Sequence, residues 1–251
     1  MKNLRLFLIV FILLSGNYGL EAQKASTNVS SPDDFFSSRD EKFLYHGKEI
    51  NGKKDGNWLV YYAHDSSLHK VENYQMGLKH GIFLQFSTRS TLISEEYFKN
   101  DLPEGLQRTY TNAGIVETVN FYRHGKLEGV QKKFYENRRD KLSELSNYKN
   151  GLKEGVSKWF DMEGNLIAEY NYHNGLLEGA QKSFYPNGKL RSIDHFVTNQ
   201  YEGESIEYYD DGKVKLSGQY EHGEKQGKWQ KFDPSGKLEN TEIYKNGQLR
   251  K

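Results

Sequence analysis

A tripeptide ending in glycine recurs about every 24 residues, and this period constrains the fold of the 251-residue chain more than any other feature. Successive anchor glycines are 25, 24, 24, 26, 24, 24 and 24 residues apart, and an aromatic residue follows each of them at position +5. Such a fixed period predicts an array of stacked structural units. The anchors are Gly56, Gly81, Gly105, Gly129, Gly155, Gly179, Gly203 and Gly227.

Each unit reads as two short strands joined by a turn. Two segments of about six to eight residues are bounded by Gly, Asn and Asp, which is typical of strands and turns. In one unit Leu166, Ala168 and Tyr170 alternate with polar residues, a period of two. Only six Ala occur in the chain, while Tyr and Gly are abundant, and both facts oppose helix. We therefore predict β-hairpins, with Gly188 and Gly212 in turns that need a positive φ.

A single hairpin of this size cannot bury its own apolar face, so neighbouring units must pair laterally. Eight hairpins give about sixteen strands, and a spacing of about 4.8 Å makes the sheet roughly 75 Å long. Hydrophobic residues make up 35% of the chain and aromatic residues 14%. That composition suits one layer coated by aromatics better than a thick core. The predicted fold is all-β, an elongated single-layer antiparallel sheet of about eight stacked β-hairpin repeats over residues 43–251.

The sequences of residues 179–203 and 227–247 carry a family resemblance. Their spacing of Asn-Gly, a later Gly and two aromatic positions resembles the MORN-repeat variant found in many bacterial proteins, including YwqK-type antitoxin-family proteins. The resemblance covers approximately residues 43–251 and implies a hairpin array without an active site. The plain MORN repeat has a denser pattern of Gly and Tyr, so its membrane and phosphoinositide roles transfer poorly to this chain.

The N-terminus has the pattern of an export signal. Lys2 and Arg5 precede an unbroken apolar run at residues 6–14, which is too short to span a bilayer but fits a signal peptide. We predict cleavage before Gln23, so that residues 1–22 are a signal peptide and the mature chain is exported, periplasmic or secreted, with no integral membrane segment. An uncleaved N-terminal anchor is the alternative. Residues 23–42 read as a linker without strand or helix, although Phe35 and Phe36 could dock on the sheet.

Composition removes several functional classes. With 35 basic and 34 acidic residues there is no general case for nucleic-acid binding. The absence of Cys excludes disulfides, a thiolate nucleophile and Cys-ligated metals. The eight His show no metal-ligand spacing, and no catalytic motif is present. We expect no enzymatic activity, no metal and no cofactor.

Two rows of side chains are candidate functional features. The aromatics at position +5 are expected to form the hydrophobic ladder of the sheet or, alternatively, a stacking platform for a glycan or an extended peptide. They are Tyr61, Phe86, Tyr110, Phe134, Phe160, Phe184, Tyr208 and Phe232.

The second row is basic and occupies position +3 of four successive units. Stacked hairpins would bring these side chains to about 10 Å from one another, on the face of the +5 aromatics. The row could bind an acidic partner or an anionic envelope polymer, or its long side chains could merely cover aromatic surface. This candidate binding strip is Arg108, Lys132, Lys158 and Lys182. The residues before the anchors include a row of glutamates that we predict to be solvated turn residues, namely Glu104, Glu128, Glu154, Glu178 and Glu202.

The sequence therefore predicts an exported, non-enzymatic repeat protein whose extended surface binds a protein or a cell-envelope partner. The family resemblance implies an alternative, an antitoxin-like inhibitor that sequesters a partner toxin.

Overall fold

The computed structural model describes residues 35–136 and 140–250 of the chain. The predicted signal peptide and most of the predicted linker lie outside the described residues. The described part is all β, with 24 strands in one sheet and antiparallel pairing throughout. The predicted single-layer hairpin array is confirmed.

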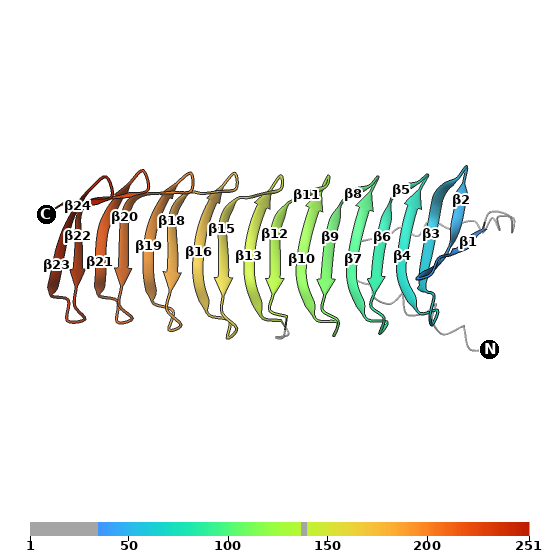
Figure 1. Cartoon of the computed structure of the whole chain (residues 1–251), viewed down its shortest axis with the longest axis horizontal. Coiled ribbons are helices and arrows are strands. Elements are labelled where there is room, and N and C mark those ends of the chain that lie inside the picture. The colour runs from blue at the N-terminus through green and yellow to red at the C-terminus, as the bar shows by residue number, and fades with distance from the viewer. Residues whose placement is uncertain (1–34, 137–139, 251) are drawn as a thin grey trace, which may run out of the picture. The chain divides into compact units, whose positions relative to one another are not determined.

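The longer strands follow one another along the chain, with two of them in each interval between anchor glycines (Figure 1). They are β1 (Phe35–Arg39), β2 (Phe43–Ile50), β3 (Lys53–Tyr62), β4 (Leu68–Gln75), β6 (Gly81–Phe86), β7 (Leu92–Lys99), β9 (Gly105–Tyr110), β10 (Val116–Arg123), β12 (Gly129–Phe134), β13 (Leu142–Lys149), β15 (Gly155–Phe160), β16 (Leu166–His173), β18 (Gly179–Phe184), β19 (Leu190–Val197), β20 (Gln200–Tyr208), β21 (Val214–Glu221), β22 (Glu224–Phe232), β23 (Leu238–Lys245) and β24 (Gln248–Arg250).

Five strands of two residues each continue into the longer strand that follows them. They are β5 (Leu78–Lys79), β8 (Leu102–Pro103), β11 (Lys126–Leu127), β14 (Leu152–Lys153) and β17 (Leu176–Leu177). Every longer strand pairs with the longer strands before and after it, as Figure 1 shows for the row from β1 to β23. The sheet is therefore a simple meander in which each repeat contacts its neighbours.

Two kinds of turn alternate along the meander. At one end of the strands, two-residue turns place both residues at positive φ, as in Asn150 (φ 53°) and Gly151 (φ 87°). Asn and Gly tolerate this conformation, and the resulting twist matches that of paired strands. At the other end the turn is longer, and Asp161 Oδ1 accepts hydrogen bonds from the backbone N–H groups of Gly164 and Asn165, both at 2.8 Å. The predicted turn glycines Gly188 and Gly212 have φ values of 79° and 94°.

The anchor glycines lie at bulges in the strand pairing, which the sequence did not predict. Residues 128–131 face only the two residues between Val119 and Tyr122. Gly129 has a φ of 67°, and a β-carbon there would meet no atom within 4 Å, so the backbone conformation alone explains the glycine. At this bulge the side chain of Gln131 bonds to both backbone groups of Phe121, accepting from N at 2.8 Å and donating to O at 3.3 Å. The glutamine thus satisfies backbone groups that the interrupted ladder leaves without strand partners.

Tyrosines at position +6 tie adjacent repeats together. Each donates its hydroxyl proton to the backbone carbonyl of the +5 aromatic in the next repeat, over 23 to 25 residues of sequence. The pairs are Tyr62 with Phe86 at 3.2 Å, Tyr135 with Phe160 at 2.7 Å, Tyr185 with Tyr208 at 2.7 Å and Tyr209 with Phe232 at 2.8 Å.

Strand β1 falls within the segment 23–42, for which the sequence predicts no strand. It pairs with β2, and the ring of Phe36 lies 5.4 Å from that of Trp58. Phe36 opposes Gly47, which has no side chain to obstruct this contact. Packing against a neighbouring strand thus orders residues that lack strand periodicity of their own.

Candidate binding surfaces

The two faces of the sheet carry different side chains. Residues at positions +1, +3 and +5 point to one face, which we call the strip face because it carries the candidate binding strip. Residues at positions −2, +2 and +4 point to the other, which we call the ring face because the ring-to-ring contacts described below gather there. This division follows from the alternation of side chains along each strand and from the cross-strand register.

The four strip residues lie in one continuous row of the cross-strand register. One residue of the intervening strand separates each from the next, and these intervening residues are, in order, Val119, Leu145 and Glu169. The structure therefore brings the four predicted positions together on one face. Whether they bind a partner stays a prediction.

Carboxylates offset part of the positive charge of the strip. Arg108 Nη1 lies 2.8 Å from Glu95 Oε2, and Lys158 Nζ lies 3.0 Å from Glu169 Oε1. The side chains of Arg108 and Lys158 are 35% and 42% exposed, so solvent screens both ion pairs. Among the described residues, Lys132 and Lys182 form no ion pair.

An exposed apolar row runs beside the strip. Leu106, Val130 and Val156 occupy position +1 of three successive repeats and are 41%, 53% and 44% exposed. Each is two residues from a strip residue on the same strand, so the apolar and basic side chains project from the same face. The three apolar side chains recur on every second strand, about 10 Å apart, so this face offers a partner alternating apolar and charged contacts.

The +5 aromatics all lie on the strip face and are all half-buried. Within the described residues, no ring contact joins two of them, and the one ring contact that any of them makes is between Tyr61 and His46, at 5.7 Å. The ring-to-ring packing expected for this row lies on the opposite face instead. The physical reason is distance, because the same position recurs only on every second strand, about 10 Å away.

The deepest burial is found on the ring face, at position +2, which the sequence analysis did not single out. Trp58, Phe83 and Trp229 are 1%, 7% and 3% exposed. Polar residues take the same position in other repeats, where Gln131 and Gln181 are 6% and 4% exposed. Because residue identity at +2 varies between repeats, a search for recurring residue types misses it.

Rings on this face form two chains of contacts. Near the N-terminal end Phe83 lies 5.5 Å from Tyr74 and 5.0 Å from Phe98. The longer chain runs through the C-terminal repeats, with centroid distances of 4.2, 4.7, 5.0 and 6.4 Å between successive rings. Its members are, in order, Phe196, Tyr201, Tyr220, Trp229 and Tyr244.

In four repeats a lysine at position −2 lies over two aromatic rings of the ring face. Lys54 Nζ is 4.4 Å from the ring of Trp58 and 4.8 Å from that of Tyr74, and it also reaches Glu72 Oε2 at 3.3 Å. Attraction of an ammonium group to aromatic faces stabilises such an arrangement. The other three lysines are Lys79, Lys153 and Lys225, each within 5.2 Å of two ring centroids.

The sequence predicts the glutamates before the anchors to be solvated turn residues, but in the structure they also accept hydrogen bonds. Glu128 Oε2 accepts a hydrogen bond at 2.9 Å from the backbone N–H of Asn150, in the turn of the next repeat. The neighbouring Gly151 N–H bonds to the carbonyl of Leu127 at 2.8 Å. Four more glutamates make the same contact, at 2.7 to 3.0 Å; they are Glu104, Glu154, Glu178 and Glu202. These hydrogen bonds join successive turns at one end of the strands, and we call the series the turn ladder.

The turn ladder also explains three of the histidines. His124 and His222 lie in turns and His173 is the last residue of strand β16, and their Nδ1 atoms are 3.7, 3.6 and 3.1 Å from the glutamate of the preceding repeat. The three belong to different repeats. No group of three or more His, Asp or Glu side chains suited to a metal ion occurs in the described part of the chain.

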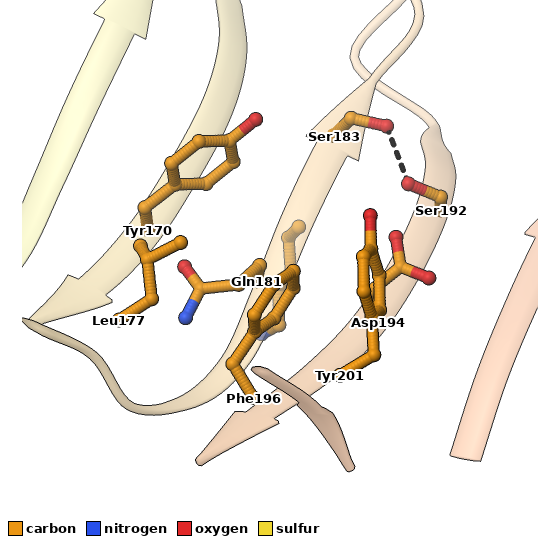
Figure 2. Close-up of a pocket in the computed structure, with 9 residues that line it drawn as sticks. Tyr170, Leu177, Gln181, Ser183, Ser192, Asp194, Phe196 and Tyr201 are labelled. Atoms are coloured by element: carbon orange, nitrogen blue, oxygen red, sulfur yellow. Dashed lines mark hydrogen bonds between the residues drawn. The ribbon is translucent and has the colours of Figure 1, made fainter. Parts of the chain in front are cut away.

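A hollow opens on the ring face over the repeat of Gly179, bounded by Tyr170 of the preceding repeat and Tyr201 of the following one (Figure 2). Its volume is about 150 Å³. Figure 2 shows Tyr170 and Leu177 on one side of it and Asp194 and Tyr201 on the other, with the Gln181 amide between them. A second, more open hollow of about 410 Å³ adjoins it and shares Tyr170 and Asp194.

The hollow combines aromatic walls with the carboxylate of Asp194, and the basic residue Lys182 also lines it. The ring of Tyr170 lies 4.8 Å from that of Trp159, and Tyr201 packs 4.2 Å from Phe196. Asp194 Oδ1 accepts a hydrogen bond from Ser205 Oγ at 2.6 Å. Burial raises the pKa of the Tyr201 hydroxyl, and the nearby charge of Asp194 raises it further.

The single-layer sheet of stacked hairpins, with a ring face and a strip face, defines a β-hairpin repeat protein. Comparison with protein families makes this specific, because four stretches match the MORN repeat variant, at residues 153–174, 177–197, 201–222 and 225–250. These four stretches are therefore similar to the MORN repeat variant, and each match begins at position −2, two residues before an anchor glycine. A search of curated proteins found no match. The described residues include no helix long and apolar enough to cross a membrane.

Proposed function

We propose that this protein is exported and non-enzymatic, and that the strip face of its sheet binds a partner protein or cell-envelope polymer. The observation that supports this most directly is the pair of parallel rows on the strip face. The apolar row of Leu106, Val130 and Val156 is exposed, and the basic strip runs beside it. A partner that offers apolar groups flanked by carboxylates or other anions would complement both rows.

The geometry of the strip favours an extended partner. Successive strip residues recur on every second strand, so they are spaced by about 10 Å, and a folded partner would meet them only over several repeats. Each contact is modest, because exposed ion pairs are worth little individually, and affinity would come from summing several of them. Binding is therefore expected to weaken with added salt.

A charge-reversal experiment tests the role of the strip. Partners are captured from the cell envelope with the full mature chain and identified by mass, and their affinity is then measured for the variant Arg108→Glu, Lys132→Glu, Lys158→Glu and Lys182→Glu. We expect a loss of at least tenfold. The matched control reverses lysines of the other face or of turns, Lys133→Glu and Lys189→Glu, and should retain binding. Unchanged affinity in the strip variant would rule out the strip as the binding surface.

The second candidate function is that of an antitoxin-like inhibitor that sequesters a partner toxin. Its support is the resemblance of the repeats to the YwqK-type antitoxin group. It predicts a toxin-like gene beside this one and rescue of growth when both are co-expressed in the same compartment. A mature chain found only outside the cytoplasm, without rescue, would overturn it.

A further inference from the structure

The hollow on the ring face stands out when the repeats are superimposed by register. In the repeat of Gly56, position +2 is Trp58 and the residue opposite it is Glu72. The lysine at position −2, Lys54, lies over the ring of Trp58 and reaches that glutamate. The same three positions can be compared in every repeat.

A carboxylate opposite position +2 accompanies a lysine at position −2 in three of the four repeats that have one. The register pairs Trp58 with Glu72, Phe83 with Glu96 and Trp229 with Glu242, and these repeats carry Lys54, Lys79 and Lys225. The fourth, which carries Lys153, pairs Ser157 with Tyr170 instead. In the repeat of Gly179 the register pairs Gln181 with Asp194, and position −2 is Leu177. Asp194 therefore has the place of Glu72, the carboxylate that Lys54 reaches, in a repeat that lacks the lysine.

The space that the missing ammonium group would fill is open. Leu177 and Asp194 both line the 150 Å³ hollow, together with Phe196, whose ring corresponds to the one that the equivalent lysines cover. Among the described residues Asp194 forms no ion pair, and its only side-chain hydrogen bond is from Ser205 Oγ. Lys182 also lines the hollow, although its position +3 belongs to the strip face. Arg191 and Lys225 line the adjoining hollow, and Lys225 lies over the rings of its own repeat.

We propose that this hollow binds a primary alkylammonium group, which the carboxylate of Asp194 holds against the rings of Phe196 and Tyr201. The ligand takes the place that a lysine of the chain itself occupies in four other repeats. The chemistry is a charge-assisted hydrogen bond to a carboxylate plus attraction of the cation to aromatic faces. A small amine and the side chain of a lysine on a partner both supply this group.

This inference concerns the ring face, opposite to the basic strip, and goes beyond the proposed function. A cation site on one face and a basic strip on the other would select different ligands by charge. The two proposals are therefore tested with different probes, and failure of one leaves the other standing.

The test is a titration of the full mature chain with n-butylammonium chloride, followed through the ring resonances of Tyr170 and Tyr201. We expect saturable shifts, and no saturation with n-butanol, which has the same alkyl chain without the charge. Asp194→Asn should weaken binding at least tenfold. Leu177→Lys should abolish it by filling the hollow from within, and should raise the melting temperature.

The matched control is Leu176→Lys, because Leu176 adjoins Leu177 on strand β17 but points to the other face. It should bind the probe as the unaltered chain does. A titration with Nα-acetyl-lysine methylamide separates the sources: binding as tight as that of butylammonium indicates a lysine side chain of a partner, and binding tenfold weaker indicates a small amine. The proposal is overturned if butylammonium does not saturate, if butanol binds equally, or if Asp194→Asn and Leu177→Lys bind the probe unchanged.

Discussion

The indole ring of Trp229 lies over Gly218 on the preceding strand, so closely that a β-carbon built on this glycine would come within 2.2 Å of the ring. Trp58 and Gly47 repeat the arrangement near the other end of the array, at 2.3 Å. Neither glycine has a positive φ, so the close approach of the ring, not the backbone, requires it. The indole N–H of Trp58 donates to a backbone carbonyl of the preceding strand at 3.0 Å, and that of Trp229 does the same at 3.2 Å.

The first prediction follows from this contact. Gly218→Ala should destabilise the protein by about 1–3 kcal/mol, because the added methyl group forces the buried ring of Trp229 or the strand to move. Urea denaturation, followed by tryptophan fluorescence, measures the change. Ser217→Ala, on the same strand but facing the other way, is the control and should stay close to the unaltered protein. Equal stability of the two variants would contradict the packing argument.

A second prediction concerns the turn ladder. Glu128→Ala removes the acceptor for the backbone N–H of Asn150 and should cost about 1 kcal/mol. Glu128→Gln should cost much less, because Gln226 already accepts the equivalent bond from Asn246 at 2.9 Å. Urea midpoints of the two variants give the comparison. If the glutamine variant were as unstable as the alanine variant, charge and not the hydrogen bond would be the stabilising factor.

Acid should weaken the turns at the other end of the strands. The Asn165 side chain, together with the backbone N–H groups of Asn165 and Gly164, lowers the pKa of Asp161 below its ordinary value of 3.8. Since the folded-state pKa is the lower one, the contribution of Asp161 to stability is present above about pH 4 and is lost as the pH falls through the folded value. A smaller loss of stability between about pH 5 and pH 2 in Asp161→Asn would confirm the role of this carboxylate.

The same titration has a direct readout. The carboxyl resonances of Asp161 should shift with a midpoint below pH 3.8. A midpoint at or above pH 3.8 would show that these hydrogen bonds do not stabilise the ionised carboxylate.

A buried serine is expected to be dispensable. Ser157 is 0% exposed, and its Oγ has no hydrogen-bond partner among the described residues. Ser157→Ala should therefore stabilise the protein by roughly 1 kcal/mol, since an unsatisfied buried hydroxyl is costly. Ser146→Ala is the contrasting variant, because Ser146 Oγ donates to Glu144 Oε1 at 2.5 Å and its loss should destabilise. Thermal melting of both variants measures the two opposite shifts, and a destabilised Ser157→Ala would show that its hydroxyl is satisfied after all.

The parts of the fold that depend on local chemistry could be predicted from the sequence. Asn-Gly turns and strand alternation are fixed by the φ preference of each residue and by the period of two, so the hairpins and the common face of the strip follow from residue order. The bulges at the anchor glycines could not be predicted, because they depend on how two strands of unequal length align. Glu128, the residue before Gly129, was therefore predicted to be a turn residue.

The ring face was missed for a different reason. The aromatic ladder was predicted at position +5 because an aromatic residue recurs there in every unit. Position +2 is instead filled by different residue types, such as Trp58, Gln131 or Ser157. A signal was nonetheless present in the four lysines at position −2 and in two glycines outside the period, Gly47 and Gly218. Aligning the units by pairs of positions, not by single residue types, would have revealed both.

The hydrogen bonds from Glu128 to the next turn and from Tyr135 to the next +5 carbonyl span one repeat and no further. In the described sheet the first and last strands do not pair with each other, so the architecture does not fix the number of repeats. Deleting or duplicating one 24-residue unit in phase would leave every remaining joint intact, and the chain would simply become shorter or longer by one step. Length is therefore the property that this architecture can change most easily, and a surface read by a long partner could be extended without redesigning any single repeat.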